Sequence, residues 1–152
     1  MQKHLVFVPV TAAERRQLKE GQELGPRSAF TVTEELCAAL DYGPDELEDA
    51  EYAAMVIASV AGLARLGARL VIVAEVDASA LGQVIDAGNG ERELHRVGPG
   101  EVTAFFTEDA GTDTAAAAAA ARGLGIDEAW ELEEVQGLLN QADLLWHGAE
   151  EL

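Results

Sequence analysis

One stretch, residues 45–77, constrains the fold of this chain more than any other, because it reads as a long buried helix followed by a buried strand. Between residues 53 and 64 only Ser59 and Gly62 are not apolar. A helix of this kind is hydrophobic nearly all round, so protein should cover it on several sides. Its apolar part is too short, and too rich in Ala and Gly, to cross a membrane. The stretch therefore predicts the core helix of a globular protein.

The ends of this helix carry recognisable signals. Gly43-Pro44 favours a helix start, and Asp45 with Glu48 has the spacing of a capping box. Gly67 is suited to end the helix in the left-handed conformation. The β-branched run 70–76 follows at once and predicts a central strand.

The rest of the chain alternates short strand and helix patterns separated by turn residues. Further strands are predicted over residues 5–10, 28–32, 91–97, 101–107 and, as a short terminal strand or docked segment, 144–147. Further helices are predicted over residues 11–20, 33–42, 80–85, 115–121 and 127–139. We predict the α/β class, with α+β as the alternative, and a single mixed sheet of about five to six strands packed by helices around the long helix.

Two details of strand placement can be predicted as well. Pro9 cannot donate a backbone hydrogen bond, which favours an edge position for the first strand. Residues 91–97 and 101–107 are separated by the tight Gly98-Pro99-Gly100 turn, which predicts an antiparallel pair. A length of 152 residues suits one domain over residues 1–152.

The formal charge of −18, from 28 acidic and 10 basic residues, disfavours binding to nucleic acid or to an anionic membrane. It suits a cationic protein partner, and we also expect a homodimer. The single cysteine, Cys37, lies in a predicted helix and offers no disulfide framework, which favours the cytoplasm. We expect no export signal, because the apolar run at residues 5–10 contains Pro9 and leads into polar residues.

No residue pattern in the chain specifies a reaction. Ser59 lacks a GxSxG context, and the glycine turns lack the lysine of a phosphate-binding loop. His4, His95 and His147 lie near predicted strands, but their spacing does not support a metal site, so we expect no metal and no cofactor. Glu51 and Tyr52 are adjacent where the helix becomes buried, and such a pair can be polarised for acid-base work. Helical neighbours point about 100° apart, however, which favours Tyr52 entering the core while Glu51 stays solvated.

Several segments together resemble an actinobacterial family of uncharacterised proteins of about this length. They are FVPVT at 7–11, LGPRSAFTVTEEL at 24–36, EYAA at 51–54, RLVIVAEV at 69–76 and LLWHGAEEL at 144–152. The resemblance covers nearly the whole chain and implies no activity. The chain departs from the family pattern at His147, where the family has Tyr, and at Glu75, where Asp is more frequent.

Three functional hypotheses remain open. The leading one is an acidic binding or regulatory module without catalytic activity. The second is a small enzyme that acts on a nucleotide through an ADP-ribosyltransferase-like half-barrel, which its element order resembles. That enzyme would need Thr11, Thr31, Thr33 and Glu108 to line one cleft. The third is a metal-binding module.

Overall fold

A seven-stranded antiparallel sheet forms the centre of the computed structural model, which describes residues 3–152. The strands are β1 (Lys3–Pro9), β2 (Arg27–Phe30), β3 (Val71–Asp77), β4 (Leu81–Asp86), β5 (Glu91–Leu94), β6 (Val102–Thr107) and β7 (Leu145–Gly148). Their order is β4-β5-β2-β1-β3-β6-β7. Every neighbouring pair is antiparallel, so the prediction of a mixed sheet with five to six strands is wrong in both respects.

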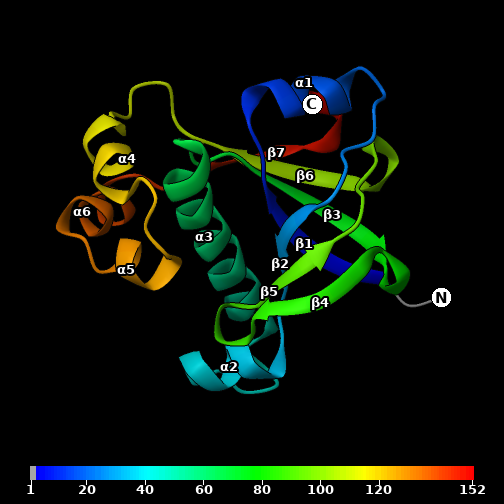
Figure 1. Cartoon of the computed structure of the whole chain (residues 1–152), viewed down its shortest axis with the longest axis horizontal. Coiled ribbons are helices and arrows are strands. Elements are labelled where there is room, and N and C mark those ends of the chain that lie inside the picture. The colour runs from blue at the N-terminus through cyan, green and yellow to red at the C-terminus, as the bar shows by residue number, and fades with distance from the viewer. Residues whose placement is uncertain (1–2) are drawn as a thin grey trace.

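The described residues also contain six α-helices, whose arrangement Figure 1 shows. They are α1 (Ala12–Lys19), α2 (Glu34–Leu40), α3 (Leu47–Leu66), α4 (Ala115–Ala121), α5 (Ile126–Trp130) and α6 (Glu133–Gln141). Short 3-10 turns η1 (Ala78–Ala80), η2 (Ala87–Asn89), η3 (Pro99–Glu101) and η4 (Ala149–Glu151) connect or follow the strands. The combination of helices and strands confirms the broad α/β expectation, and the antiparallel pairing favours the α+β form of it.

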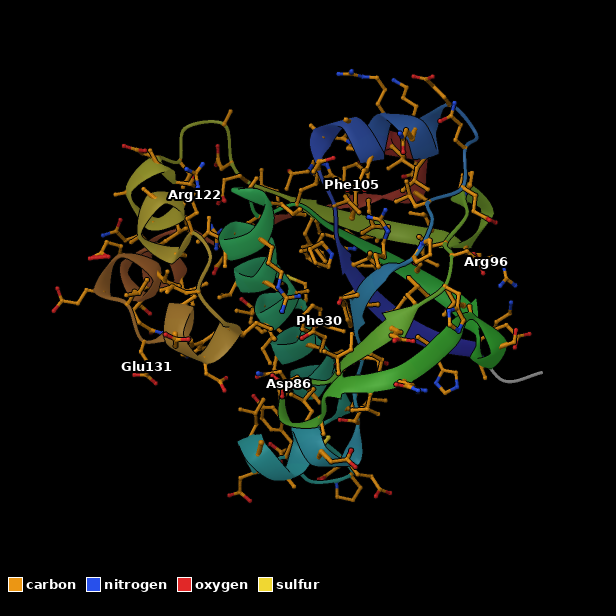
Figure 2. The ribbon with its side chains drawn as sticks, viewed as in Figure 1. Phe30, Asp86, Arg96, Phe105, Arg122 and Glu131 are labelled. Atoms are coloured by element: carbon orange, nitrogen blue, oxygen red, sulfur yellow. The ribbon has the colours of Figure 1, made fainter. Side chains whose placement is uncertain are left out.

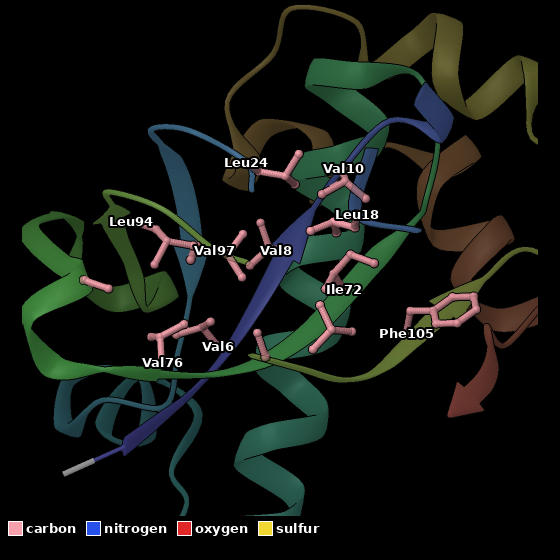
Figure 3. Packing of buried hydrophobic residues seen from close by; sticks show 14 of the residues in the cluster. Val6, Val8, Val10, Leu18, Leu24, Ile72, Val76, Leu94, Val97 and Phe105 are labelled. Carbon is pink, nitrogen blue, oxygen red and sulfur yellow. The ribbon is translucent and has the colours of Figure 1, made fainter. Parts of the chain in front are cut away.

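The alternation along β1 explains how the sheet buries both faces. Val6 and Val8 point to one face, where they meet Leu18 of α1 in a cluster that Figure 3 shows. Phe7 points to the other face and packs against α3. Successive side chains of a strand point to opposite faces, so a strand that is apolar at every position must be covered on both sides.

The long helix α3 lies between the sheet and a group formed by α4, α5 and α6 (Figure 1). Ile57 and Ala58 contact the sheet side, whereas Val60 and Leu63 contact the three small helices. Every residue from 57 to 64 is buried, which confirms the predicted core helix.

The cap predictions for α3 have mixed outcomes. Gly67 ends the helix with φ of +81°, as expected. The predicted capping box of Asp45 and Glu48 does not form. The helix starts at Leu47, and its N-cap residue Glu46 makes no side-chain hydrogen bond to the first turn. Instead, the Glu46 carboxylate accepts a hydrogen bond from the backbone N–H of Gly43 and fixes the preceding turn.

Three other local predictions are corrected by the sheet. The expected helix ending at Ile85 is strand β4. It is preceded by η1, in which the Asp77 side chain accepts a hydrogen bond from the N–H of Ser79. Strands β5 and β6 do not pair with each other: β5 lies between β4 and β2, and β6 lies between β3 and β7. Strand β1 is interior, which is possible because Pro9 is its last residue and costs no ladder bond within the strand.

Candidate functional site

A cleft of about 500 Å³ opens between the N-terminal half of α3 and the small helices α5 and α6. Figure 1 shows α5 and α6 beside α3 on the side away from the sheet. Residues from six segments line the cleft, including Leu40, Tyr42, Tyr52, Val56, Ser59, Arg69, Asn89, Asp127, Trp130, Leu139, Asn140, Asp143 and Leu144. This volume lies in the range of small-molecule pockets, and convergence of separate elements on one cavity is typical of them.

The walls of the cleft are mostly apolar and aromatic. Tyr52 is 57% exposed, so the expectation that it enters the core is wrong, and its ring stands at the mouth of the cleft instead. Trp130, at the end of α5, is half-buried, and its carbonyl accepts a hydrogen bond of 2.6 Å from the Gln136 side chain. That bond joins α5 to α6 and fixes the wall that faces α3.

Arg69 lines the cleft at its boundary with the sheet, just before β3, and is only 3% exposed. It forms a two-point ion pair with Glu108, in which Nε donates to Oε2 over 2.8 Å and Nη2 donates to Oε1. Nη2 also donates to the carbonyl of Ala142 over 3.0 Å. Because Glu108 follows β6 and Ala142 precedes β7, one guanidinium ties together the ends of three neighbouring strands.

Polar side chains also line the cleft. The amide of Asn89 donates to Asp86 over 2.7 Å and to Asp127 over 3.1 Å, which links η2 to the start of α5. Asp127 and Asp143 are exposed carboxylates of the lining. Among the lining residues Arg69 is the only basic one, and Glu108 balances its charge.

The residues proposed for the half-barrel enzyme have other roles, and none of them lines this cleft. Thr11 forms the capping box of α1 with Glu14. Thr31 is buried and donates to the carbonyl of Leu5 over 2.8 Å, whereas Thr33 caps α2 by accepting from the N–H of Leu36. Glu108 pairs with Arg69, and Glu51, the acid-base candidate beside Tyr52, is half-buried one turn inside α3.

The remaining candidates also occupy structural positions. The Ser59 hydroxyl lies against the cleft but donates to the carbonyl of Val56 over 2.6 Å. Cys37 is half-buried and unpaired in α2. In the part of the chain that the structure describes, no three His, Cys, Asp or Glu side chains come together in a way that could hold a metal ion.

Of the residues that line the cleft, sequence reasoning weighed only Tyr52 and Ser59 as functional candidates. Arg69 and Glu108 are 39 positions apart, and Trp130 lies in a weak helical pattern. One available signal was a charged residue at the start of an otherwise apolar strand, since such a residue is almost never fully buried without a partner.

Figure 2 shows the side chains of the molecule, with charged groups at its surface. Arg96, Arg122 and Glu131 are exposed, whereas Phe30 is fully buried between the sheet and α3. In residues 3–152 no helix combines the length and the apolar character needed to cross a bilayer.

Comparison with known proteins gives one result. Neither curated proteins nor solved structures yield a significant match to this chain. A family model matches residues 5–152, which is nearly the whole sequence, and confirms the expected membership in a family without a known activity. The chain belongs to this family of unknown function, DUF6912.

Proposed function

We propose that this protein is a binding module that takes a small amphipathic organic molecule into the cleft between α3, α5 and α6. The observation that carries the proposal is the cleft itself, which is about 500 Å³ in volume and lined by apolar and aromatic side chains with a few convergent polar groups. The Ser59 hydroxyl is engaged by its own helix, which supports binding rather than nucleophilic catalysis.

The test uses N-phenylnaphthylamine, an uncharged probe whose fluorescence rises in apolar surroundings. We expect saturable enhancement with the native chain. Ala53→Phe places a ring inside the cleft, because Ala53 lies on the wall formed by α3, and should abolish the enhancement. Ala13→Phe adds the same ring to an exposed position of α1 and should leave probe binding unchanged. Equal binding by both variants, or no enhancement with the native chain, would refute the proposal.

A homodimer through β7 is the partner arrangement that the sheet favours. Among residues 3–152, strand β7 is hydrogen-bonded to another strand on one side only. It carries Leu145 and Trp146, which are 45% and 63% exposed. Its pairing with β6 is regular, whereas the register of the other edge strand, β4, shifts twice against β5. Regular, apolar edges favour addition of another strand, and bulges discourage it. A second copy of β7 would make a self-complementary antiparallel pair.

Light scattering on the native chain and on Trp146→Lys tests this arrangement. We expect a mass of two chains for the native protein and of one chain for the variant. A native mass of one chain would rule out the dimer and leave a cationic protein as the partner that the charge of −18 suits. The cytoplasmic location and the actinobacterial origin remain predictions from the sequence.

A further inference from the structure

The guanidinium of Arg69 retains a donor that the protein does not use. Its Nε and Nη2 atoms bond to Glu108 and Ala142, whereas Nη1 makes no hydrogen bond to any residue between 3 and 152. Over the same residues, Arg92 Nε is the one fully enclosed side-chain nitrogen or oxygen without a partner, so Nη1 of Arg69 is not fully enclosed. Because Arg69 lines the cleft, we infer that Nη1 faces it. An arginine that is 3% exposed and still offers N–H groups to a cavity is a built donor site.

The surrounding charges determine what this donor can accept. Glu108 neutralises Arg69, so a ligand carboxylate at Nη1 would lie beside another carboxylate without a net positive charge to stabilise it. Asp127 and Asp143 add negative charge to the lining. A ligand ammonium cannot accept a hydrogen bond from Nη1 at all. An uncharged carbonyl oxygen is an acceptor without either penalty.

We propose that the ligand of the cleft is an uncharged molecule with an apolar body of aromatic size and a carbonyl group that accepts a hydrogen bond from Nη1 of Arg69. This inference rests on the proposed binding function and specifies its ligand class. The apolar body lies against Val56, Trp130 and Leu139, which line the cleft. In this arrangement Glu108 is a positioning residue, because it orients the guanidinium and cancels its charge.

Three probes that share a phenyl group separate the proposal from simple apolar binding. They are phenylacetamide, phenylacetate and propylbenzene, and each is titrated as a competitor of N-phenylnaphthylamine. Transfer of an amide from water costs more than transfer of a hydrocarbon, so each affinity is first corrected for the water-to-octanol transfer free energy of the compound. After this correction we expect phenylacetamide to bind about ten-fold more tightly than propylbenzene, as one added hydrogen bond to a charged donor allows. We expect phenylacetate to bind more weakly than the amide. Equal corrected affinities of amide and hydrocarbon, or preference for the carboxylate, would overturn the inference while the binding function stands.

Two variants identify the groups responsible. The double variant Arg69→Met with Glu108→Gln removes the donor without leaving the half-buried Glu108 carboxylate unpaired. It should bind propylbenzene as before but lose the preference for the amide. The single variant Glu108→Gln keeps the donor and removes the neutralising charge, so phenylacetate should now bind about ten-fold more tightly than to the native chain. If the amide preference persists in the double variant, or if phenylacetate gains nothing in the single one, Arg69 does not select the ligand.

These measurements also separate a failure of the binding function from a failure of the inferred ligand class. Failure of N-phenylnaphthylamine and of all three competitors to bind the native chain would remove the binding function and the inference together. Binding of the hydrocarbon without a preference for the amide would remove the inference alone. The comparison of the three probes uses the native chain, so it decides the matter even if a variant does not fold.

Discussion

Arg65, in the last turn of α3, donates from both terminal nitrogens to the carboxylate of Glu91 at the start of β5. The two distances are 2.7 Å from Nη1 to Oε2 and 3.3 Å from Nη2 to Oε1. The side chain of Glu91 is 3% exposed, whereas that of Arg65 is 41% exposed. The buried member of the pair is therefore the acid, and the arginine connects it to solvent.

Replacing Arg65 by Met should destabilise the protein more than replacing Glu91 by Gln. The first change leaves a buried carboxylate unpaired, which we expect to cost about 1–3 kcal/mol, less than for a fully buried pair because water reaches Arg65. The second change removes the buried charge, and the carbonyl oxygen of the new glutamine can still accept a hydrogen bond from Arg65. Urea unfolding of both single variants and of the double variant measures the order, and a larger loss in Glu91→Gln would contradict it.

A second ion pair makes part of the stability depend on pH. Burial raises the pKa of Glu14, but the hydrogen bond and charge of Arg27, together with hydrogen bonds from Thr11, lower it more, so the net pKa lies below its usual value. Arg27 Nη2 lies 2.7 Å from Glu14 Oε2 and joins α1 to β2. A carboxyl whose folded pKa is depressed contributes stability above its unfolded pKa, and this contribution is lost as the pH falls through the folded pKa.

Arg27→Gln should therefore lower the free energy of unfolding at pH 7 by at most about 1 kcal/mol, because solvent partly screens the pair. The difference between variant and native chain should shrink once the pH falls below the unfolded pKa of Glu14. Urea midpoints measured from pH 7 down to pH 3 test this trend. Arg16→Gln, on the same helix, is the matched control, since Arg16 makes no ion pair with the described residues. A constant difference at all pH values would mean that Arg27 does not lower the pKa of Glu14.

Local signals in the sequence predicted the elements that depend on neighbouring residues. Gly67 ends α3 as predicted, and α1 and α2 lie within the predicted ranges 11–20 and 33–42, because the caps at Thr11 and Thr33 are decided within a few residues. Strand β4 was missed because Val84 and Ile85 are both exposed on an edge, so no period of two marks a buried face.

The candidate site depended on relations that a single sequence does not contain. The cleft needs α5 and α6 to lie against α3, and the Arg69–Glu108 pair needs β3 and β6 to be neighbours. The tight turn between residues 97 and 101 favoured a hairpin, yet β5 pairs with β2 and β6 pairs with β3. The pairing of strands across the sheet overrode the local turn signal. Without the strand order, the sequence could not place Glu108 beside Arg69.

Glycine at position 62 is required by close packing, which makes an unusual prediction for a helix. A Cβ added at Gly62 would lie 2.8 Å from the carbonyl oxygen of Ala68 and 3.2 Å from Cβ of Pro9. In an open helix, Gly→Ala stabilises by about 0.5–1 kcal/mol. In this contact we expect Gly62→Ala to destabilise by about 1–3 kcal/mol instead, because backbone atoms must move.

Gly137→Ala is the control for this effect. Gly137 lies within α6, and an added Cβ would meet no atom within 4 Å. The substitution should raise the free energy of unfolding by roughly the ordinary helix propensity difference of about 0.5–1 kcal/mol. Thermal or urea unfolding of the two variants should give shifts of opposite sign. Stabilisation by both would show that α3 and the segment after it are packed less tightly than the distances indicate.

His147 on β7 has two separable contacts with β6. Its ring stacks on the buried ring of Phe105, with centroids 4.8 Å apart and planes inclined by 19°. Its Nε2 lies 2.8 Å from the hydroxyl of Thr107. An edge strand has a backbone partner on one side only. These two side-chain contacts with β6 should therefore help to hold β7 in register.

Two substitutions of His147 should separate these contributions. His147→Phe keeps the stacked ring and loses the hydrogen bond, for an expected cost of about 0.5–1.5 kcal/mol. His147→Ala also loses the stacking, which adds about 0.5–1.5 kcal/mol and exposes part of Phe105. Hydrogen exchange of the β7 amides, compared with global urea unfolding, should show local loss of protection first in the alanine variant. Equal stability of the two variants would mean that the ring stacking does not hold the strand, and the Thr107 hydrogen bond would then account for the whole effect.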